Sequence, residues 1–295
     1  MKTIAICNNK GGVAKTTTAV NLAAILARDF GRRVLVIDAD SQGNATSFLG
    51  GDKSRPGMAA LLQGAPMVPL QLTNTGTDMQ LIAASDELMD LDLTKAGEGK
   101  LALGCLRDLR QYLETQPLPF DYCLVDCPPA FNAASSAALI AADAVLIPVK
   151  LDAFALEGMA NLTRQIANMR KINPRLRVLG VLPVMWYRSE TIIKAESALR
   201  NAGLRVLPRI RRSDRVDDMT YHQQPLIVCS PRSGPCRDYR ALASWIVGQE
   251  RRDTSSGAVA PPSPQGEGRK PLRGHDVEPG KRRPGRTRKG GVGNG

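Results

Sequence analysis

The sequence predicts an α/β fold: a doubly wound, mostly parallel sheet with helices on both faces. Two observations carry this prediction. Apolar, β-branched runs alternate along the chain with helix-length amphipathic segments. The apolar runs are also nearly continuous, as in parallel strands that are buried on both faces. Strand–helix alternation over this length predicts right-handed crossovers between neighbouring strands.

Each predicted strand is a short apolar run, such as the Arg-Val-Leu-Val-Ile-Asp segment at 33–38. The predicted strands, in chain order, are 2–7, 33–38, 79–83, 121–126, 144–149 and 177–182. The predicted helices are the amphipathic segments of helix length that lie between these runs. They are 16–29, 100–114, 133–141, 154–172 and 190–202.

The composition predicts one large folded domain with an aliphatic core. The chain has 295 residues, of which 43% are hydrophobic and only 4% aromatic. No apolar run approaches the roughly 18 residues that a membrane span needs. The best candidate, 137–149, is interrupted by Asp143, and the apolar start of the chain ends at Asn8 and Asn9, too early for a secretory signal. We therefore expect a cytoplasmic protein that does not use a membrane.

The net charge of +12 is unevenly distributed. Residues 1–159 carry 13 Lys/Arg and 17 Asp/Glu, whereas residues 160–215 carry 13 and 3, a net charge of +10. This asymmetry suggests a face for a polyanion, although a solvated charged surface is the plainer alternative. Residues 250–295 are rich in Gly, Pro, Ser, Arg and Lys. They predict a disordered basic tail after a folded domain that spans 1–249.

The six cysteines form no C-x-x-C pair. We expect small buried thiols in a reducing compartment. A metal or iron–sulfur site is the alternative, because Cys105 and Cys127 could meet in space.

The segment KGGVAKTTT, at 10–18, directly follows the first predicted strand. It fails the usual phosphate-loop pattern G-x-x-x-x-G-K-[ST], because the two glycine positions fall on Asn9 and Ala14. A glycine turn before a helix nevertheless makes an anion site, since backbone N–H groups point at the phosphates. Lys15 is placed to reach the β/γ-phosphates and Thr16 to bind Mg²⁺. A simple helix cap would not explain two lysines that flank Gly-Gly.

The segment KGGVAKTT resembles the deviant Walker A motif, K-G-G-x-x-K-[ST], of the ParA/MinD family of dimeric ATPases, whose fold is that of P-loop NTPases. The resemblance implies weak ATPase activity with ATP and Mg²⁺ as cofactors. It implies catalytic roles for Lys15 and for Lys10, which in that family reaches across the dimer to the partner's ATP. Most members have Gly at the position of Ala14, so loop geometry could differ here. The implied nucleotide contacts are Gly11, Gly12, Val13, Ala14, Lys15, Thr16 and Thr17.

Three aspartates at predicted strand ends extend the resemblance. The segment RVLVIDADSQGNATSFLG, at 33–50, resembles the family's D-x-D motif, which implies that Asp40 positions the attacking water and that Asp38 supports the Mg²⁺ shell. The segment FDYCLVDCPP, at 120–129, resembles its Walker B motif, so Asp126 is expected to hold Mg²⁺ through water. Three carboxylates at the carboxyl ends of strands fit a ligand site at that edge of the sheet.

The resemblance covers residues 2 to about 248. The segment VLPRIRRSDRVDD resembles the family's adenine-side loop and implies a nucleotide contact at Pro208. The ParA branch often has Pro-Arg-Asn in this loop, and Ile210 stands at the position of the asparagine, so an amide contact to the base is expected to be lost. Arg188 and Arg212 match positions where ParA-type proteins bind DNA without sequence preference.

The resulting hypothesis is a short, Soj-like partition ATPase, because the chain begins at the first strand and leaves no room for an N-terminal helix-turn-helix domain. Its expected partners are nonspecific DNA, a ParB-like protein and a second copy of itself in an ATP-dependent homodimer, at the nucleoid. Three alternatives remain open: a membrane-cycling MinD-like ATPase, an accessory DNA-binding protein that uses ATP only as a switch, and an ATP-dependent electron donor like the nitrogenase iron protein. The cargo is also open.

Overall fold

The computed structural model describes residues 1–65, 69–72, 79–95, 109, 111–115, 120–152 and 155–256. Within this part, residues Met1–Asp253 form one compact unit. Its centre is a seven-stranded sheet in the order β3-β4-β2-β5-β1-β6-β7. The strands are β1 (Lys2–Ile6), β2 (Val34–Asp38), β3 (Leu70–Gln71), β4 (Met79–Ile82), β5 (Tyr122–Asp126), β6 (Ala144–Lys150) and β7 (Arg177–Val184).

Every pairing in this sheet is parallel except that of the edge strand β3 with β4. The sheet register places Ile6 opposite Asp126, and Asp38 opposite Asp126 on the other side of β5. The carboxyl ends of β1, β2 and β5 therefore meet at one edge of the sheet. This is the edge where open parallel sheets bind ligands.

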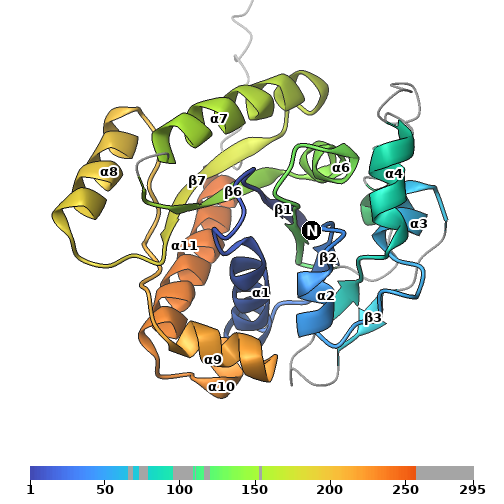
Figure 1. The fold of residues 1–295 in the computed structure, drawn as a ribbon, viewed down its shortest axis with the longest axis horizontal. Coiled ribbons are helices and arrows are strands. Elements are labelled where there is room, and N and C mark those ends of the chain that lie inside the picture. Colours follow the sequence, from blue (N-terminus) through green and yellow to red (C-terminus); the bar gives the residue numbers. More distant parts are fainter. Residues whose placement is uncertain are drawn as a thin grey trace, which may run out of the picture. The chain divides into compact units, whose positions relative to one another are not determined.

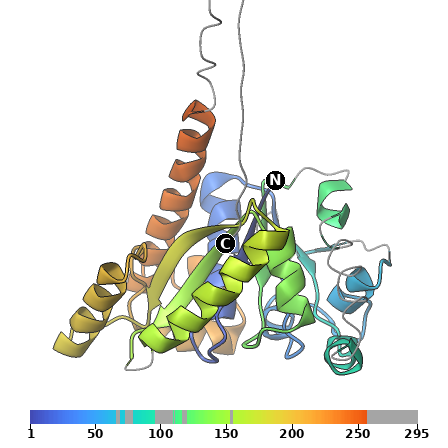
Figure 2. The same ribbon diagram turned by 90° about the horizontal axis from the view of Figure 1, so that it is seen from above.

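Helices cover both faces of the sheet, as Figures 1 and 2 show. The helices described are α1 (Lys15–Phe30), α2 (Asn44–Phe48), α3 (Met58–Leu62), α4 (Glu87–Lys95), α6 (Ala133–Ala141), α7 (Ala155–Ile172), α8 (Glu190–Asn201), α9 (Arg215–His222), α10 (Leu226–Cys229) and α11 (Gly234–Ser256). Helices α1, α2, α9, α10 and α11 pack their buried side chains into one core cluster. Helices α3, α4, α6, α7 and α8 pack into the other.

The fold class predicted from the sequence is confirmed, and all six predicted strands are present within two residues at either end. Four of the predicted helices are also present, as α1, α6, α7 and α8. The fifth predicted helix, 100–114, lies largely outside the described residues. The described residues in this part of the chain, 109 and 111–115, are helical. The predicted elements did not include the two-residue strand β3, the helices α4 and α11, or the short helices α2, α3, α9 and α10. Short elements depend on tertiary contacts rather than on their own periodicity.

Helix α11 extends to Ser256, so the first seven residues of the predicted tail are helical rather than disordered. Residues 257–295 lie outside the described residues, and the tail stays a prediction there. Cys7, Cys123, Cys127 and Cys236 are buried free thiols, as expected, whereas the free thiol of Cys229 is partly exposed and Cys105 lies outside the described residues. Among the helices described, none combines the length and the apolar character needed to cross a membrane.

Candidate functional site

The predicted phosphate loop connects β1 to α1 at the ligand-binding edge of the sheet. Gly11 and Gly12 are exposed, whereas Val13 is buried and anchors the loop to the core. Gly12 has φ +69°, a conformation that glycine adopts without steric cost. A Cβ atom built on Gly11 or Gly12 would have no neighbour within 4 Å. Space is therefore open in front of the loop, where a phosphate group would lie.

Ala14 precedes the first residue of α1 and adopts a left-handed conformation, with φ 58° and ψ 36°. Its carbonyl oxygen accepts the first hydrogen bond of the helix, from the backbone N–H of Thr18 at 3.0 Å. A left-handed conformation costs a residue with a Cβ atom about 1–2 kcal/mol. The substitution of alanine for the usual glycine therefore leaves local backbone strain in the loop at Ala14.

Lys15 begins α1 and is buried, with only 7% of its surface exposed. Its ammonium donates a hydrogen bond to the carbonyl oxygen of Lys10 at 3.1 Å, which folds the side chain back along the loop. An ammonium has three hydrogens. The remaining donor capacity can serve phosphate oxygens at this site.

Lys10 takes a different direction, because its ammonium forms an ion pair with Asp152, which lies two residues beyond the end of β6. The loop before it is fixed by Asn8, which donates to the carbonyl oxygen of Pro148 at 2.7 Å, and by Asn9, which donates to Gln165 of α7 at 2.7 Å. In this single chain, Lys10 is therefore held toward the β6–α7 side of the site.

Asp126 ends β5 directly beneath the loop, and its side chain fits a divalent cation. Both carboxylate oxygens are buried and have no hydrogen-bond partner of ordinary geometry. Burial raises the pKa of Asp126 well above its usual range, and the nearby charge of Asp38 raises it further. The nearby Thr16 hydroxyl partly offsets this rise, because it lowers the pKa of Asp126. A carboxylate and a hydroxyl that face phosphate oxygens are the usual protein ligands of Mg²⁺ in such sites.

Asp38 ends β2 beside Asp126 and is fully buried. Its carboxylate accepts hydrogen bonds from the backbone N–H of Thr46 at 2.7 Å, from the Thr46 hydroxyl at 2.8 Å and from the backbone N–H of Asp40 at 3.2 Å. Burial raises the pKa of Asp38 to about 6. Asp38 thus holds the start of α2 and the D-x-D turn in place. The sequence did not single out Thr46, which also accepts a hydrogen bond from the backbone N–H of Ala84 at 2.8 Å.

Asp40 lies two residues beyond β2 and is 8% exposed. Its carboxylate accepts a hydrogen bond from the backbone N–H of Gln42 at 3.0 Å, which orients the side chain in the turn before α2. Asp38, Asp40 and Asp126 therefore gather at one edge, as their positions at strand ends predicted. Within the described part of the chain, no group of three or more His, Cys, Asp or Glu side chains could hold a metal ion by itself. Mg²⁺ usually keeps several water ligands and takes others from substrate phosphates.

A pocket of about 320 Å³ opens beside the phosphate loop, on its α9 side. Ile210, one of its lining residues, is 3% exposed, and its backbone is hydrogen-bonded to Pro183 and Trp186. Pro208 is exposed and does not line the pocket, in contrast to the predicted contact. The pocket is lined by Ala14, Thr17, Lys150, Val184, Met185, Tyr187, Ile210, Arg211, Arg212, Ser213, Asp214, Val216, Asp217 and Tyr239. Its size and partly apolar wall suit a nucleotide base.

The two arginines predicted to bind DNA lie on neighbouring segments. The segment after β7 pairs with the adenine-side loop through a parallel bridge between Trp186 and Arg211. The backbone N–H of Arg212 donates to the carbonyl oxygen of Trp186 at 2.9 Å. Arg188 and Arg212 follow this bridge, and both are exposed. The structure therefore brings them close together, although 24 positions separate them in the sequence.

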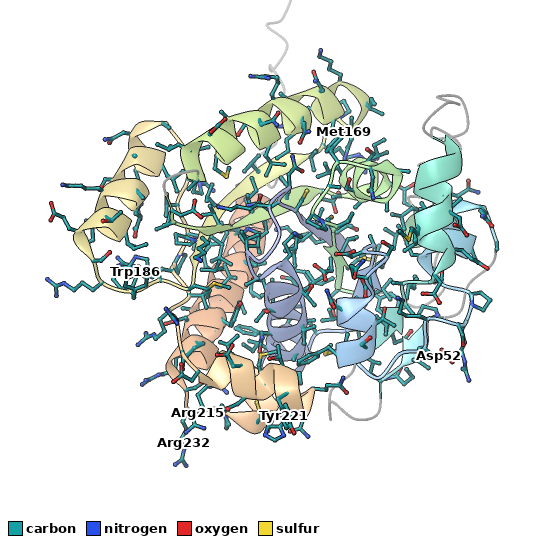
Figure 3. All side chains as sticks on the ribbon, viewed as in Figure 1. Asp52, Met169, Trp186, Arg215, Tyr221 and Arg232 are labelled. Carbon is teal, nitrogen blue, oxygen red and sulfur yellow. The ribbon has the colours of Figure 1, made fainter. Side chains whose placement is uncertain are left out.

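A side-chain network that the sequence did not reveal fixes these segments. The indole nitrogen of Trp186 donates to Glu196 of α8 at 3.2 Å, and Arg209 stacks over the indole ring at 4.0 Å. Glu196 also pairs with Arg200 at 2.9 Å. On the other side, Arg211 forms two side-chain hydrogen bonds of 2.7 Å with Asp238 of α11. Figure 3 shows Trp186 on the segment after β7, beside α8.

The fold and this site define a P-loop ATPase. The family model described as an AAA domain matches residues 1–178. The chain is 37% identical to the chromosome-partitioning ATPase Soj of Thermus thermophilus over 252 residues, which cover 84% of this chain and 96% of the relative. It is 34% identical to the chromosome partitioning protein ParA of Caulobacter vibrioides over 258 residues, with coverage of 85% and 96%.

Solved structures agree with this assignment. A cobyrinic acid a,c-diamide synthase of Mycobacterium smegmatis, bound to an ATP analogue and magnesium, superposes with a TM-score of 0.72 at 26% identity, covering 86% of this chain and 97% of that one. The ATP complex of a McdA variant from Cyanothece superposes with a TM-score of 0.71 at 28% identity, with coverage of 84% and 96%. The chain belongs to the ParA/Soj-type partition ATPases of the ParA/MinD family, and it is an ATPase that uses ATP and Mg²⁺.

Proposed function

We propose that this ATPase is a DNA-partition switch. Its ATP-bound homodimer binds DNA without sequence preference, and hydrolysis stimulated by a ParB-like partner releases it. The observation that carries the proposal is the bridge between Trp186 and Arg211. It joins the wall of the 320 Å³ pocket, called the base pocket below, to the exposed pair of Arg188 and Arg212. Two arginines on adjacent segments can neutralise neighbouring phosphates of a DNA backbone.

DNA binding is coupled to nucleotide binding because the pocket beside the phosphate loop and the arginine pair share a residue. Arg212 lines the base pocket and also belongs to the arginine pair. A base in this pocket would pack against Ile210 and fix the segment that carries Arg212. A second chain would double the number of arginines, so that the dimer binds DNA more tightly than the monomer. A ligand that favours the dimer thereby favours DNA binding.

Lys10 and Asp40 supply the remaining steps of the proposal. Lys10 has to leave Asp152 before it can reach a partner's nucleotide, and the ion pair that it leaves is partly exposed, with 43% and 30% of the two side chains accessible. Such pairs stabilise by only about 0–1 kcal/mol. The free energy needed to break the ion pair is therefore small enough to be supplied by nucleotide binding. Asp40, whose carboxylate accepts a hydrogen bond from the backbone N–H of Gln42, would orient the attacking water molecule.

DNA binding at two salt concentrations, with ATP and with ADP, tests the proposal. Arg188→Glu combined with Arg212→Glu should abolish ATP-dependent DNA binding and leave ATP-dependent dimers intact. The logarithm of the binding constant falls linearly with the logarithm of the salt concentration. Each arginine–phosphate interaction that the substitutions remove should reduce the magnitude of this slope by about 0.9. The matched control is Arg33→Glu combined with Arg55→Glu, which reverses two exposed arginines elsewhere on the molecule and should keep ATP-dependent binding.

A truncation after Ser256 separates the folded face from the basic tail, because it keeps α11 whole. The truncated protein should bind DNA more weakly but still depend on ATP. If the truncated protein loses all DNA binding while the double arginine variant keeps its ATP dependence, the tail is the DNA module and the proposed face is wrong. If DNA release proceeds normally in an Asp40→Ala variant that cannot hydrolyse ATP, the protein is an ATP-switched DNA-binding protein instead.

A further inference from the structure

Two cysteines lie side by side beneath the phosphate loop, and the nucleotide chemistry uses neither. Cys7 directly follows β1 and Cys127 directly follows β5. Both are free thiols with no exposed surface, and both belong to the same core cluster. The thiol of Cys127 donates to the carbonyl oxygen of Val125 at 3.8 Å.

The sheet fixes this proximity. Strands β1 and β5 are parallel neighbours, and the last residues in register are Ile6 and Asp126. Cys7 and Cys127 are therefore the next pair in the same register, and the backbone N–H of Cys127 donates to the carbonyl oxygen of Ile6 at 3.2 Å. Neighbouring strands lie about 4.8 Å apart. Disulfides span Cα–Cα distances of about 4.4–6.8 Å, so that the backbones of this pair lie within the range for a bridge.

The pair also lies where a covalent bond would affect nucleotide binding. Cys7 lies three residues before Lys10, whose carbonyl oxygen accepts the hydrogen bond from the phosphate-binding ammonium of Lys15 at 3.1 Å. Cys127 follows Asp126, and Cys7 begins the segment that leads into the phosphate loop. A bond between the sulfurs would shorten their separation to about 2.05 Å and would pull the start of the loop toward the end of β5. Displacements of about 1 Å in catalytic sites can lower the reaction rate about 100-fold.

We propose that Cys7 and Cys127 are a redox modification site, at which hydrogen peroxide forms a reversible disulfide that lowers the affinity for ATP. Because both sulfurs are buried, the reaction requires a local opening of the phosphate loop that admits peroxide to Cys7. The Cys7 sulfur then attacks one peroxide oxygen, the O–O bond breaks, and the released hydroxide takes the thiol proton to form water. The Cys127 sulfur then attacks the resulting sulfenic acid, forms the S–S bond and displaces a second water. Two thiols and one peroxide thus become one disulfide and two waters. Disulfides of this kind in a reducing compartment are transient and regulatory.

Peptide mapping of the full-length protein tests bond formation. Trypsin should release Cys7 in the peptide 3–10, and Cys123 together with Cys127 in the peptide 111–150. After peroxide treatment without nucleotide, the two peptides should be linked, and fragmentation between Cys123 and Cys127 should place the link on Cys127. A Cys123→Ser variant should give the same linked pair. Absence of the link, or a link to Cys123, would overturn the proposal.

Binding of a fluorescent ATP analogue tests the consequence. Peroxide should weaken binding to the wild-type protein and to Cys123→Ser at least ten-fold, and dithiothreitol should restore it. Cys7→Ser and Cys127→Ser should keep their binding after the same treatment. An equal loss in Cys7→Ser, or a loss that dithiothreitol does not reverse, would contradict the proposal. These measurements involve no DNA, so they succeed or fail independently of the proposed partition function.

Discussion

Replacing Ala14 by glycine tests the strain in the phosphate loop. Ala14 has φ 58° and ψ 36°, which costs a residue with a Cβ atom about 1–2 kcal/mol. Glycine removes this cost but adds about 0.4–1 kcal/mol of conformational entropy to the unfolded chain. Ala14→Gly should therefore leave the free energy of unfolding unchanged or raise it by up to about 1.5 kcal/mol.

The matched control is Ala160→Gly, an exposed position inside α7. There the substitution should lower the free energy of unfolding by about 1 kcal/mol, because the backbone is in the ordinary helical conformation. Thermal unfolding without nucleotide measures both variants, and 1 kcal/mol corresponds to about 2–4 °C in a domain of this size. If Ala14→Gly destabilises the protein as much as Ala160→Gly does, Ala14 is not in the left-handed conformation and the reasoning fails.

Four further predictions concern the charged residues of the site. Asp40→Ala should still bind ATP and trap a dimer, while stimulated turnover falls by about 10²–10⁴-fold; unchanged turnover would reject its role. Lys10→Ala should bind ATP but form no ATP-dependent dimer in size-exclusion chromatography, whereas Lys15→Ala should lose ATP binding itself; normal dimers from Lys10→Ala would exclude the cross-subunit role. Asp152→Ala should lower the ATP concentration needed for dimerisation about 2–5-fold, because Lys10 loses a partly exposed ion pair; a higher requirement would show that Asp152 supports the dimer. Burial raises the pKa of Asp38 from 3.8 to about 6, so the folded state keeps a proton that the unfolded chain releases, and stability should fall as pH rises from 4 to 6. Denaturant unfolding without nucleotide should show a smaller fall in Asp38→Asn, and an unchanged fall would assign it to another group.

The sequence determined the features that depend on neighbouring residues. The phosphate loop lies between a strand and a helix that are contiguous with it, so its residues and its position at a helix N-terminus could be predicted from 18 consecutive residues. The aspartates at the ends of β2 and β5 could be predicted to converge, because parallel strands align their carboxyl ends. The aliphatic character of the apolar runs was sufficient to identify six of the strands.

Only the tertiary structure decided which distant side chains meet. It placed Thr46 on Asp38, joined Lys10 to Asp152, and brought the segments of Arg188 and Arg212 into one bridge.

It also placed Ile210, and not Pro208, in the wall of the pocket, and it aligned Cys7 with Cys127 through the register of β1 and β5. These contacts depend on strand order and register, which connect residues up to 142 positions apart in the case of Lys10 and Asp152. A hydrophobic pattern fixes which face of a strand is buried, but it carries no information on which strand lies next to it, because that choice is made by the packing of the whole sheet.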